Sequence, residues 1–419
     1  PVGDVLRGDL PWINVKDPAY GAKGDGTTDD SAAIGAAAAA ANAVSGALLF
    51  PPGVYGMESE VATGANLRAM VSFGATVKRL TTAATKLFRL HASASTQVTG
   101  FIVDGNRGAL TIADPTQFID ILQLGGKSII SGNRFLNAPG SSVAGQASAA
   151  QIFGNHFENW RDHAVYFSGT SSTSNAKDIL ITSNVFVHDV STENGCVKFR
   201  NNVVNWTVSN NVVDLLCSTP FVQDDRSGTA GLGDELNYTN KRGIVTGNSG
   251  ECVYFYGTLS VTPIADLATF ATTTLSNNTV KCTFFAYLGD ATYPGLGSLE
   301  IIGNNVDGVL VRIVKVQNTI SAVEYANRLV MKNNAHTGRA ISAISNLPRT
   351  VVYQGNDHTG TTAPFYFQTA DTETDTKTFD IGDNRSTASS SPFCVSHSTL
   401  APNTTPRIRR NRMSGSTRI

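Results

Sequence analysis

Short runs in which apolar and polar residues alternate recur along most of this chain. In the run from Asp178 to Asn184, Ile179 and Ile181 fall on the same side of an extended backbone. Runs of about five residues, rich in β-branched and aromatic types and bounded by Gly, Asn and Ser, are typical of short strands. Helical repeats would need windows of about ten residues or more with a 3.6-residue period, and no such window follows Val44. The pattern predicts an all-β protein.

An asparagine returns in the same local setting about once every 28 residues, at spacings between 22 and 37 residues. Each has an apolar residue three positions before it, as Ile181 precedes Asn184. The positions are Asn106, Asn133, Asn155, Asn184, Asn211, Asn248, Asn278, Asn305, Asn334, Asn356, Asn384 and Asn411. A repeat of this length with one fixed residue per period predicts a solenoid, here a parallel β-helix with coils about 4.8 Å apart. We expect the asparagine to occupy a left-handed turn and its amide to hydrogen-bond along the stack.

The overall composition narrows the classes of partner. The 419 residues carry a net charge of −1 and only 16% are charged, so no electrostatic argument favours nucleic acid or an anionic membrane surface. No apolar run reaches about 18 residues, so no membrane span is predicted. No basic and apolar leader precedes Pro1.

The cysteines are odd in number and show no CxxC spacing. Four of the five lie on successive coils, where cysteine behaves as a small apolar residue. They are Cys196, Cys217, Cys252, Cys282 and Cys394. We predict buried, reduced thiols, and the sequence indicates neither a metal site nor a cofactor.

The N-terminal segment, residues 1–56, differs from the repeats. A strand at Ile13 to Val15 leads into a glycine-rich turn, and a helix is predicted over about Asp30 to Ala41, with Thr28 and Asp29 at its N-terminus. We expect this segment to cap the first coil and keep its edge from pairing with another molecule. The β-helix itself is expected over residues 57–419.

The same segment contains the motif INVKD, YGAKGDGTTDDSAAI and LFPPGVY between Trp12 and Tyr55. It resembles the opening of the pectate-lyase-superfamily right-handed β-helix proteins, although Pro18 and Ala19 are inserted where most relatives have none. That superfamily includes phage tailspike depolymerases, family 28- and 55-like glycosidases, polysaccharide lyases and alginate epimerases. The resemblance implies a right-handed β-helix that binds or cleaves a polysaccharide outside the cell, and it does not select the reaction. A phosphate-binding loop is not indicated, because the GxxxxGKS/T spacing is missing.

Strands that follow the asparagine turns suggest a substrate-binding wall. Five segments were aligned by their alternation: His163 to Ser168, Gly195 to Arg200, Pro220 to Asp225, Glu251 to Tyr256 and Thr283 to Tyr287. If the valines and phenylalanines face inward, the outer face carries aromatic and cationic side chains suited to sugar rings. These are Tyr166, Lys198, Arg200, Tyr254 and Tyr256.

Acidic residues gather beside this predicted wall. Asp224 and Asp225 lie on a strand between the Lys198 and Tyr254 segments, and the long loop from Arg226 to Tyr238 follows them. The candidate catalytic carboxylates are Asp224, Asp225, Asp234, Glu235 and Glu193, with Arg226 as a candidate binding residue. Paired carboxylates are what glycoside hydrolysis needs, so the first hypothesis is a glycoside hydrolase. The alternative for these acids is a solvated polar loop beside ordinary turn aspartates.

Arg161 and His163 lie near the same wall. The Arg-Asp-His run is either part of a site or a hydrogen-bonded turn. A second hypothesis is therefore a lyase or epimerase acting on uronic acids, with its base among Lys198, Arg200, His163 and Tyr254. A third is a non-catalytic glycan-binding fibre. The likeness to tailspikes implies a homotrimer, although no trimerising module follows Asn411, a pattern that also fits a shorter tail protein or a secreted enzyme.

Overall fold

The computed structural model of the protein is described for most of the chain. The described residues are 10–81, 86–93, 95–110, 120–145, 149–169, 176–188, 195–200, 203–216, 220–225, 242–259, 272–288, 296–313, 326–343, 350–360, 365–367, 377–387 and 404–413. The chain divides into two compact units: a first unit of Pro1–Thr170 and Ser174–Lys198, and a second unit of Ser171–Thr173 and Phe199–Ile419.

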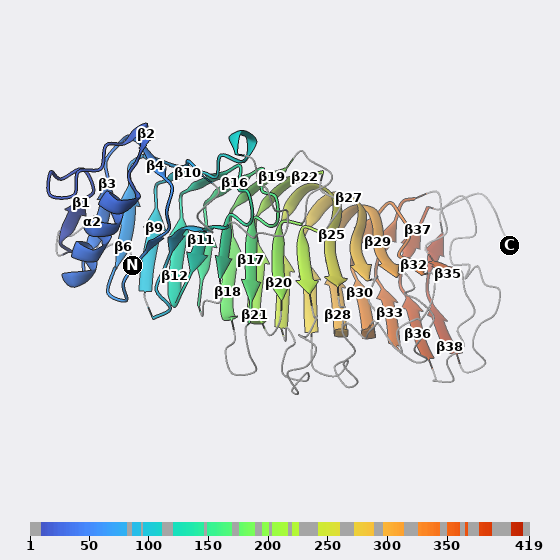
Figure 1. Ribbon diagram of the computed structural model, residues 1–419. Coiled ribbons are helices and arrows are strands. Elements are labelled where there is room, and N and C mark those ends of the chain that lie inside the picture. The colour runs from blue at the N-terminus through green and yellow to red at the C-terminus, as the bar shows by residue number, and fades with distance from the viewer. Residues whose placement is uncertain are drawn as a thin grey trace, which may run out of the picture. The chain divides into compact units, whose positions relative to one another are not determined.

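In the first unit each coil adds one strand to sheet A. All neighbouring strands are parallel, and apolar residues stack in register, as Ile130 pairs with Ile152 and Ile152 with Ile181. The strands are β1 (Trp12–Asn14), β3 (Ala47–Phe50), β6 (Ala69–Ser72), β9 (Ser95–Thr99), β12 (Lys127–Ser131), β15 (Gln151–Phe153) and β18 (Ala176–Thr182). Figure 1 shows β6, β9 and β12 side by side.

Sheet B of the first unit receives one or two shorter strands from each coil. They are β2 (Asp25–Asp29), β4 (Val54–Met57), β5 (Val61–Ala62), β7 (Thr76–Arg79), β8 (Lys86–Arg89), β10 (Ile102–Asp104), β11 (Asp120–Leu124), β13 (Arg134–Leu136), β14 (Val143–Gly145), β16 (His156–Glu158), β17 (Val165–Ser168) and β19 (Val185–His188). The strand β20 (Val197–Arg200) has residues in both units. A 3₁₀ helix, η1 (Arg107–Ala109), follows β10.

The second unit repeats this plan. Its sheet A strands are β21 (Val203–Ser209), β24 (Arg242–Thr246), β26 (Thr272–Ser276), β28 (Leu296–Ile302), β30 (Ala326–Lys332), β33 (Thr350–Gln354), β36 (Lys377–Gly382) and β38 (Thr404–Arg409). Its sheet B strands are β22 (Val212–Leu215), β23 (Val222–Asp225), β25 (Ser249–Leu259), β27 (Thr279–Leu288), β29 (Asn305–Ile313), β31 (Ala335–His336), β32 (Ile341–Ala343), β34 (Asp357–His358), β35 (Phe365–Phe367), β37 (Arg385–Ser386) and β39 (Arg412–Met413). The fold of each unit is a parallel β-helix, as the sequence predicts.

The repeating asparagines form a buried ladder at the turn between sheets A and B. The Asn248 backbone N–H and its Nδ2 both donate to Oδ1 of Asn278, each at 3.0 Å, and Nδ2 also donates to the carbonyl of Val208. That carbonyl belongs to the apolar residue three positions before Asn211, so the spacing seen in the sequence is a hydrogen-bonding unit. The same contacts recur within the first unit from Asn133 to Asn184 and within the second from Asn211 to Asn411.

Three details of the predicted ladder are wrong. Asn106 lies outside it and donates instead to the carbonyl of Arg79. On the coil of β28 the ladder residue is Asn304, whereas Asn305 begins β29. The left-handed turn belongs to the residue before the ladder asparagine, as at Gly303 (φ +68°) and Asp383 (φ +58°). The ladder asparagine is therefore selected for its two-sided amide and not for its backbone conformation.

The N-terminal motif builds a tight local structure. The buried carboxylate of Asp30 accepts the backbone N–H groups of Lys23 and Gly24, at 2.6 and 3.0 Å, and so closes the glycine-rich turn. Hydrogen bonds from the backbone and hydroxyl of Thr28, with smaller contributions from Thr27, lower the pKa of Asp25. The motif residues thus serve the fold.

The helix α2 (Ser31–Ala43) begins one residue later than predicted and contacts β1, β3 and β5. Asp29 accepts the backbone N–H of Ser31 at 3.0 Å. Strands of the same segment already pair with later ones, β3 with β6 and β4 with β7. That the segment caps the first coil, with a boundary after residue 56, stays a prediction.

The interior follows the ladder. The second residue after a ladder asparagine is buried on most of the described coils, and Phe135, Phe157 and Phe186 stack there with ring centroids 5.1 and 5.0 Å apart. Cys196, Cys252 and Cys282 are buried thiols outside any disulfide, as predicted, while Cys217 and Cys394 lie outside the described residues.

Candidate functional site

The predicted wall depends on the register of β25, and there the alignment was wrong by three residues. Tyr256 was expected opposite Asp225, but Val222 is its pairing partner and Asp224 pairs with Thr258. The cause is that β25 runs for 11 residues without a break. Its first part pairs with β22 and its last part with β23, so the segment that begins at Glu251 belongs to a different stretch of the coil.

Asp224 and Tyr256 meet in the interior of the second unit. Tyr256 Oη donates to Asp224 Oδ2 at 3.0 Å and lies 3.5 Å from Oγ1 of Thr273, a buried residue of sheet A. Neither Asp224 nor Tyr256 has any exposed surface. The prediction that Tyr256 faces outward is therefore wrong, and the Asp224 carboxylate is closed off from any polysaccharide on the outer wall. Tyr254 is half-buried and stacks on Phe284 at 5.6 Å.

Several predicted residues fall where the structure gives no side chain. Glu193, Arg226, Asp234 and Glu235 lie outside the described residues. The backbone of Asp225 ends β23, and its side chain is likewise outside the description. Their roles stay predictions.

The first unit contains a cluster of polar side chains around His163. Its Nδ1 lies 2.9 Å from Oδ2 of Asp162, a close ionic contact without the alignment of a hydrogen bond. The same Oδ2 accepts the hydroxyl of Ser141 at 3.3 Å. His163 is 3% exposed, and its ring stacks on Tyr166 with centroids 5.4 Å apart and planes 23° from parallel. The half-buried Tyr166 is thus supported from behind by a buried His–Asp pair.

Lys198 lies beside Tyr166 on the next coil. The Val165 N–H donates to the carbonyl of Cys196 at 3.0 Å. The same offset joins Val143 N–H to Ala164, where Val143 pairs with Val165. Tyr166 therefore pairs with Lys198, about 4.8 Å away along the sheet.

The other two cations of the predicted wall are Arg200 and Arg161. Lys198 and Arg200 are both half-buried, but Arg200 belongs to the second unit. Arg161 precedes Asp162, and its backbone N–H donates to the carbonyl of Ala138. Tyr166 and Lys198 thus lie on neighbouring strands, and His163 lies buried behind Tyr166.

A groove of about 420 Å³ in the second unit was not predicted. Its lining includes Leu216, Val253 and Val309 beside three charged residues, Glu251, Lys281 and Asp307. Glu251 pairs with Lys281 and Lys281 with Asp307, and Nζ of Lys281 lies 2.8 Å from Oε1 of Glu251.

The charged residues of this groove interact with one another. The hydrogen bond to Glu251, then the charges of Glu251 and Asp307, raise the pKa of Lys281. Thr337 Oγ1 donates to Asp307 Oδ1 at 2.7 Å. All four residues stand three positions after a ladder asparagine, so the repeat itself could have revealed them. Because Asn305 was taken as the ladder asparagine in place of Asn304, the shared position of these four residues was not recognised.

The chain is similar to known proteins in both sequence and fold. The sequence profile of "Rhamnogalacturonase A/epimerase, pectate lyase-like" matches residues 12–244, more than half of the chain. The chain belongs to this family. No curated protein matches it.

Three solved structures are similar at low sequence identity. The catalytic domain of a GH87 α-1,3-glucanase in complex with nigerose has a TM-score of 0.52 at 9% identity, over 92% of this chain and 67% of that one. The mannuronan C-5 epimerase AlgE6 A-module of Azotobacter vinelandii has 0.48 at 16% identity, over 96% and 99%. The endo-xylogalacturonan hydrolase of Aspergillus tubingensis has 0.46 at 14%, over 97% and 93%. The fold is a right-handed parallel β-helix, as the sequence predicts.

No helix in the described part of the chain is long and apolar enough to cross a membrane. No group of three or more His, Cys, Asp or Glu side chains in the same part of the chain is placed to hold a metal ion.

Proposed function

We propose that the chain is a polysaccharide-active enzyme. We further propose that it moves a proton on an acidic sugar at Tyr166 and the residues around it. The observation that carries this proposal is the stacking of Tyr166 on the buried His163–Asp162 pair, with Lys198 beside it. A half-buried phenol next to an ammonium group suits a sugar that carries a carboxylate. Family membership supports a polysaccharide as the substrate class.

The role proposed for each side chain depends on whether the sugar can reach it. In a uronic acid the proton at C5 is acidified by the neighbouring carboxylate, and Lys198 would neutralise that carboxylate. Tyr166 would take the C5 proton as a phenolate and return it to the oxygen that leaves C4 as the C4–O bond breaks, which forms a C4–C5 double bond and regenerates the phenolate. Return of a proton to C5 from the other face would give epimerisation instead. His163, at 3% exposure, would position the Tyr166 ring and not touch the sugar.

The first experiment follows products from a panel of acidic and neutral polysaccharides. A product that absorbs in the ultraviolet shows elimination, and solvent deuterium at C5 without cleavage shows epimerisation. We expect Tyr166→Phe to lower kcat by a factor of about 100 or more with KM changed little, because the ring remains and only the hydroxyl is lost. New reducing ends without ultraviolet absorption would contradict the proposal.

A matched pair of variants tests the role of His163. His163→Phe keeps an aromatic ring under Tyr166, whereas His163→Ala removes it. If His163 positions Tyr166, the phenylalanine variant keeps most of the activity that the alanine variant loses. Equal inactivity of the two folded variants would make His163 itself the acid or base.

Glycoside hydrolysis is a second candidate, favoured by the groove in the second unit. Glu251 and Asp307 flank Lys281 with their backbones two strand spacings apart, about 9.6 Å, which is just above the range of about 6.5–9.5 Å between the carboxyl groups of inverting enzymes. Glu251, which accepts a hydrogen bond from Lys281, would activate water and Asp307 would protonate the leaving oxygen. Loss of reducing-end production in both Glu251→Gln and Asp307→Asn, with Tyr166→Phe active, would select this candidate.

The location and assembly of the protein are also proposals. An extracellular polysaccharide as partner implies a site of action outside the cell. A homotrimer is the proposed state, and sedimentation equilibrium of the purified chain tests it. A mass equal to one chain at all concentrations would contradict the trimer.

A further inference from the structure

We propose that the last coils of the second unit hold a separate binding site for an acidic sugar. A pocket of about 720 Å³ lies there, at the corner of the asparagine ladder, within the size range of ligand pockets. Its charged lining residues are Asp357, Asp383, Arg385, Arg410 and Arg412. We name it the arginine pocket.

Two arginines of the pocket lie directly opposite one another. Asp357 pairs with Arg385 on the next strand, and Arg385 pairs with Arg412 on the one after. Like charges at directly opposed positions destabilise a sheet unless a counter-charge is present. Asp357 Oδ2 lies 3.9 Å from Nη1 of Arg385, the limit of an ion pair, and within the described residues Arg412 has no ion pair. This arrangement has room for an anion.

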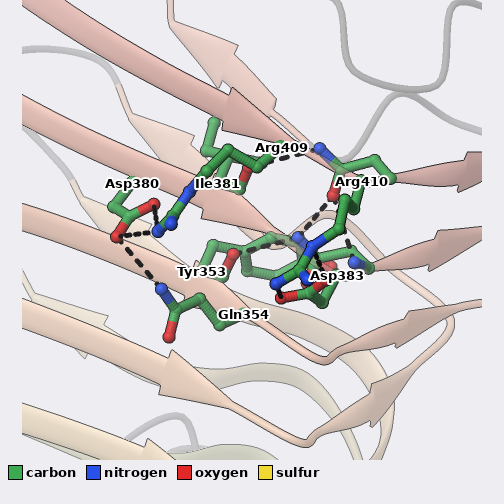
Figure 2. A network of polar contacts seen from close by, with 9 residues as sticks. Tyr353, Gln354, Asp380, Ile381, Asp383, Arg409 and Arg410 are labelled. Atoms are coloured by element: carbon green, nitrogen blue, oxygen red, sulfur yellow. Dashed lines mark hydrogen bonds and ion pairs between the residues drawn. The ribbon is translucent and has the colours of Figure 1, made fainter.

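The neighbouring arginines differ, because each is already neutralised. Figure 2 shows Arg409 reaching both carboxylate oxygens of Asp380, at 2.9 Å each, and Arg410 reaching Asp383. Nε and Nη2 of Arg410 lie 2.9 and 3.1 Å from the two oxygens of Asp383. The positive charge available to a ligand is therefore that of Arg385 and Arg412.

A buried acceptor in the same pocket points to a sugar. The side chain of Asp357 is 45% exposed, but its Oδ1 atom is covered and, within the described residues, has no hydrogen-bond partner. A buried acceptor without a partner costs free energy that a hydroxyl donor from a ligand would recover. A sugar carboxylate on Arg385 and Arg412 and a sugar hydroxyl on Asp357 would satisfy all three residues. The choice of an acidic sugar over another hydroxylated anion rests on the proposed function. The geometry of the pocket is independent of that function.

The test measures binding of trigalacturonate by calorimetry to the Tyr166→Phe chain, in which turnover is blocked. The neutral trisaccharide of galactose is the control ligand. We expect the Arg385→Ala, Arg412→Ala double variant to bind the uronate about tenfold more weakly or worse, because two charge-assisted contacts are lost. Arg328→Ala removes an arginine that pairs with Glu300 on sheet A and should leave binding unchanged.

Stability separates a lost site from a lost fold. Without ligand, Arg412→Ala should keep or raise the melting temperature, since it breaks no described ion pair and removes a like-charge neighbour. Undiminished binding by the folded double variant, equal binding of the neutral sugar, or no binding by the parent chain would each overturn the pocket. Weaker binding by the double variant, together with neither an ultraviolet-absorbing product nor C5 deuterium exchange from the chain that retains Tyr166, would keep the pocket and reject the proton-transfer mechanism.

Discussion

Two histidines of the second unit occupy positions that phenylalanines hold in the first. His336 and His358 are the second residues after Asn334 and Asn356, they pair in register, and their rings lie 4.9 Å apart. His336 Nδ1–H donates to the carbonyl of Gly338 and its Nε2 accepts the Tyr353 hydroxyl, both at 2.7 Å. These contacts fix the orientation of the His336 ring.

Burial, followed by the charge of His358, lowers the pKa of His336 to about 3. Burial also lowers the pKa of His358, against the opposing charge of Asp357. Burial raises the pKa of Tyr353, which keeps its proton for His336. Among the described residues, the charged groups that contribute to these three shifts are His358 and Asp357.

The sign of the pH effect follows from these directions. Below pH 6.5 the unfolded chain takes up a proton at each histidine while the folded chain does not, so stability falls as the pH falls from 6.5 toward 3 and is fully present above 6.5. The loss is about 1.4 kcal/mol per pH unit, or about 2 kcal/mol at pH 5 for His336. For a unit of this size that corresponds to a fall of about 4–8 °C in melting temperature.

The assay compares melting temperatures at about pH 7.5 and pH 5 for the parent chain and for a variant with His336→Gln and His358→Gln. The variant should be less stable at both pH values, but its fall between them should be smaller by about 4 °C or more. His91→Gln, at an exposed histidine of the first unit, serves as the control and should match the parent. An identical fall in parent and double variant would refute the assignment of the acid sensitivity to this pair.

Three further predictions concern the fold. Asn278→Ala should cost about 3 kcal/mol or more in chemical denaturation, because the buried backbone N–H of Asn248 loses its acceptor and the carbonyl of Val245 loses its Nδ2 donor, and a loss under 1 kcal/mol would show that the ladder contributes little. Asp224→Ala should lower the free energy of unfolding by about 1–3 kcal/mol by removing the acceptor of Tyr256 while leaving turnover intact, whereas a catalytic Asp224 would abolish turnover. Reductant should leave the melting temperature unchanged, since the described thiols are free, and a large drop would reveal a disulfide.

The candidate site was only partly visible in the sequence. Tyr166 and Lys198 could be placed side by side because both strands follow a turn after their ladder asparagine and alternate regularly. Tyr256 could not, because no glycine or proline lies between Cys252 and Tyr256, where β25 passes from one stretch of the coil to the next. A register error of an odd number of residues exchanges the inner and outer faces of a strand.

The coil repeat is determined by the sequence itself, because an asparagine amide in a parallel stack needs the same residue and the same preceding carbonyl on every coil. That requirement is local and periodic, so it can be recognised in the sequence alone. The tertiary structure decided which polar groups turn inward, as Asp224 does beneath Tyr256, and which stand together on the surface, as Arg385 and Arg412 do. Those outcomes depend on contacts between residues a whole coil apart, and the length of each coil varies with its loops, so spacing along the chain does not specify them.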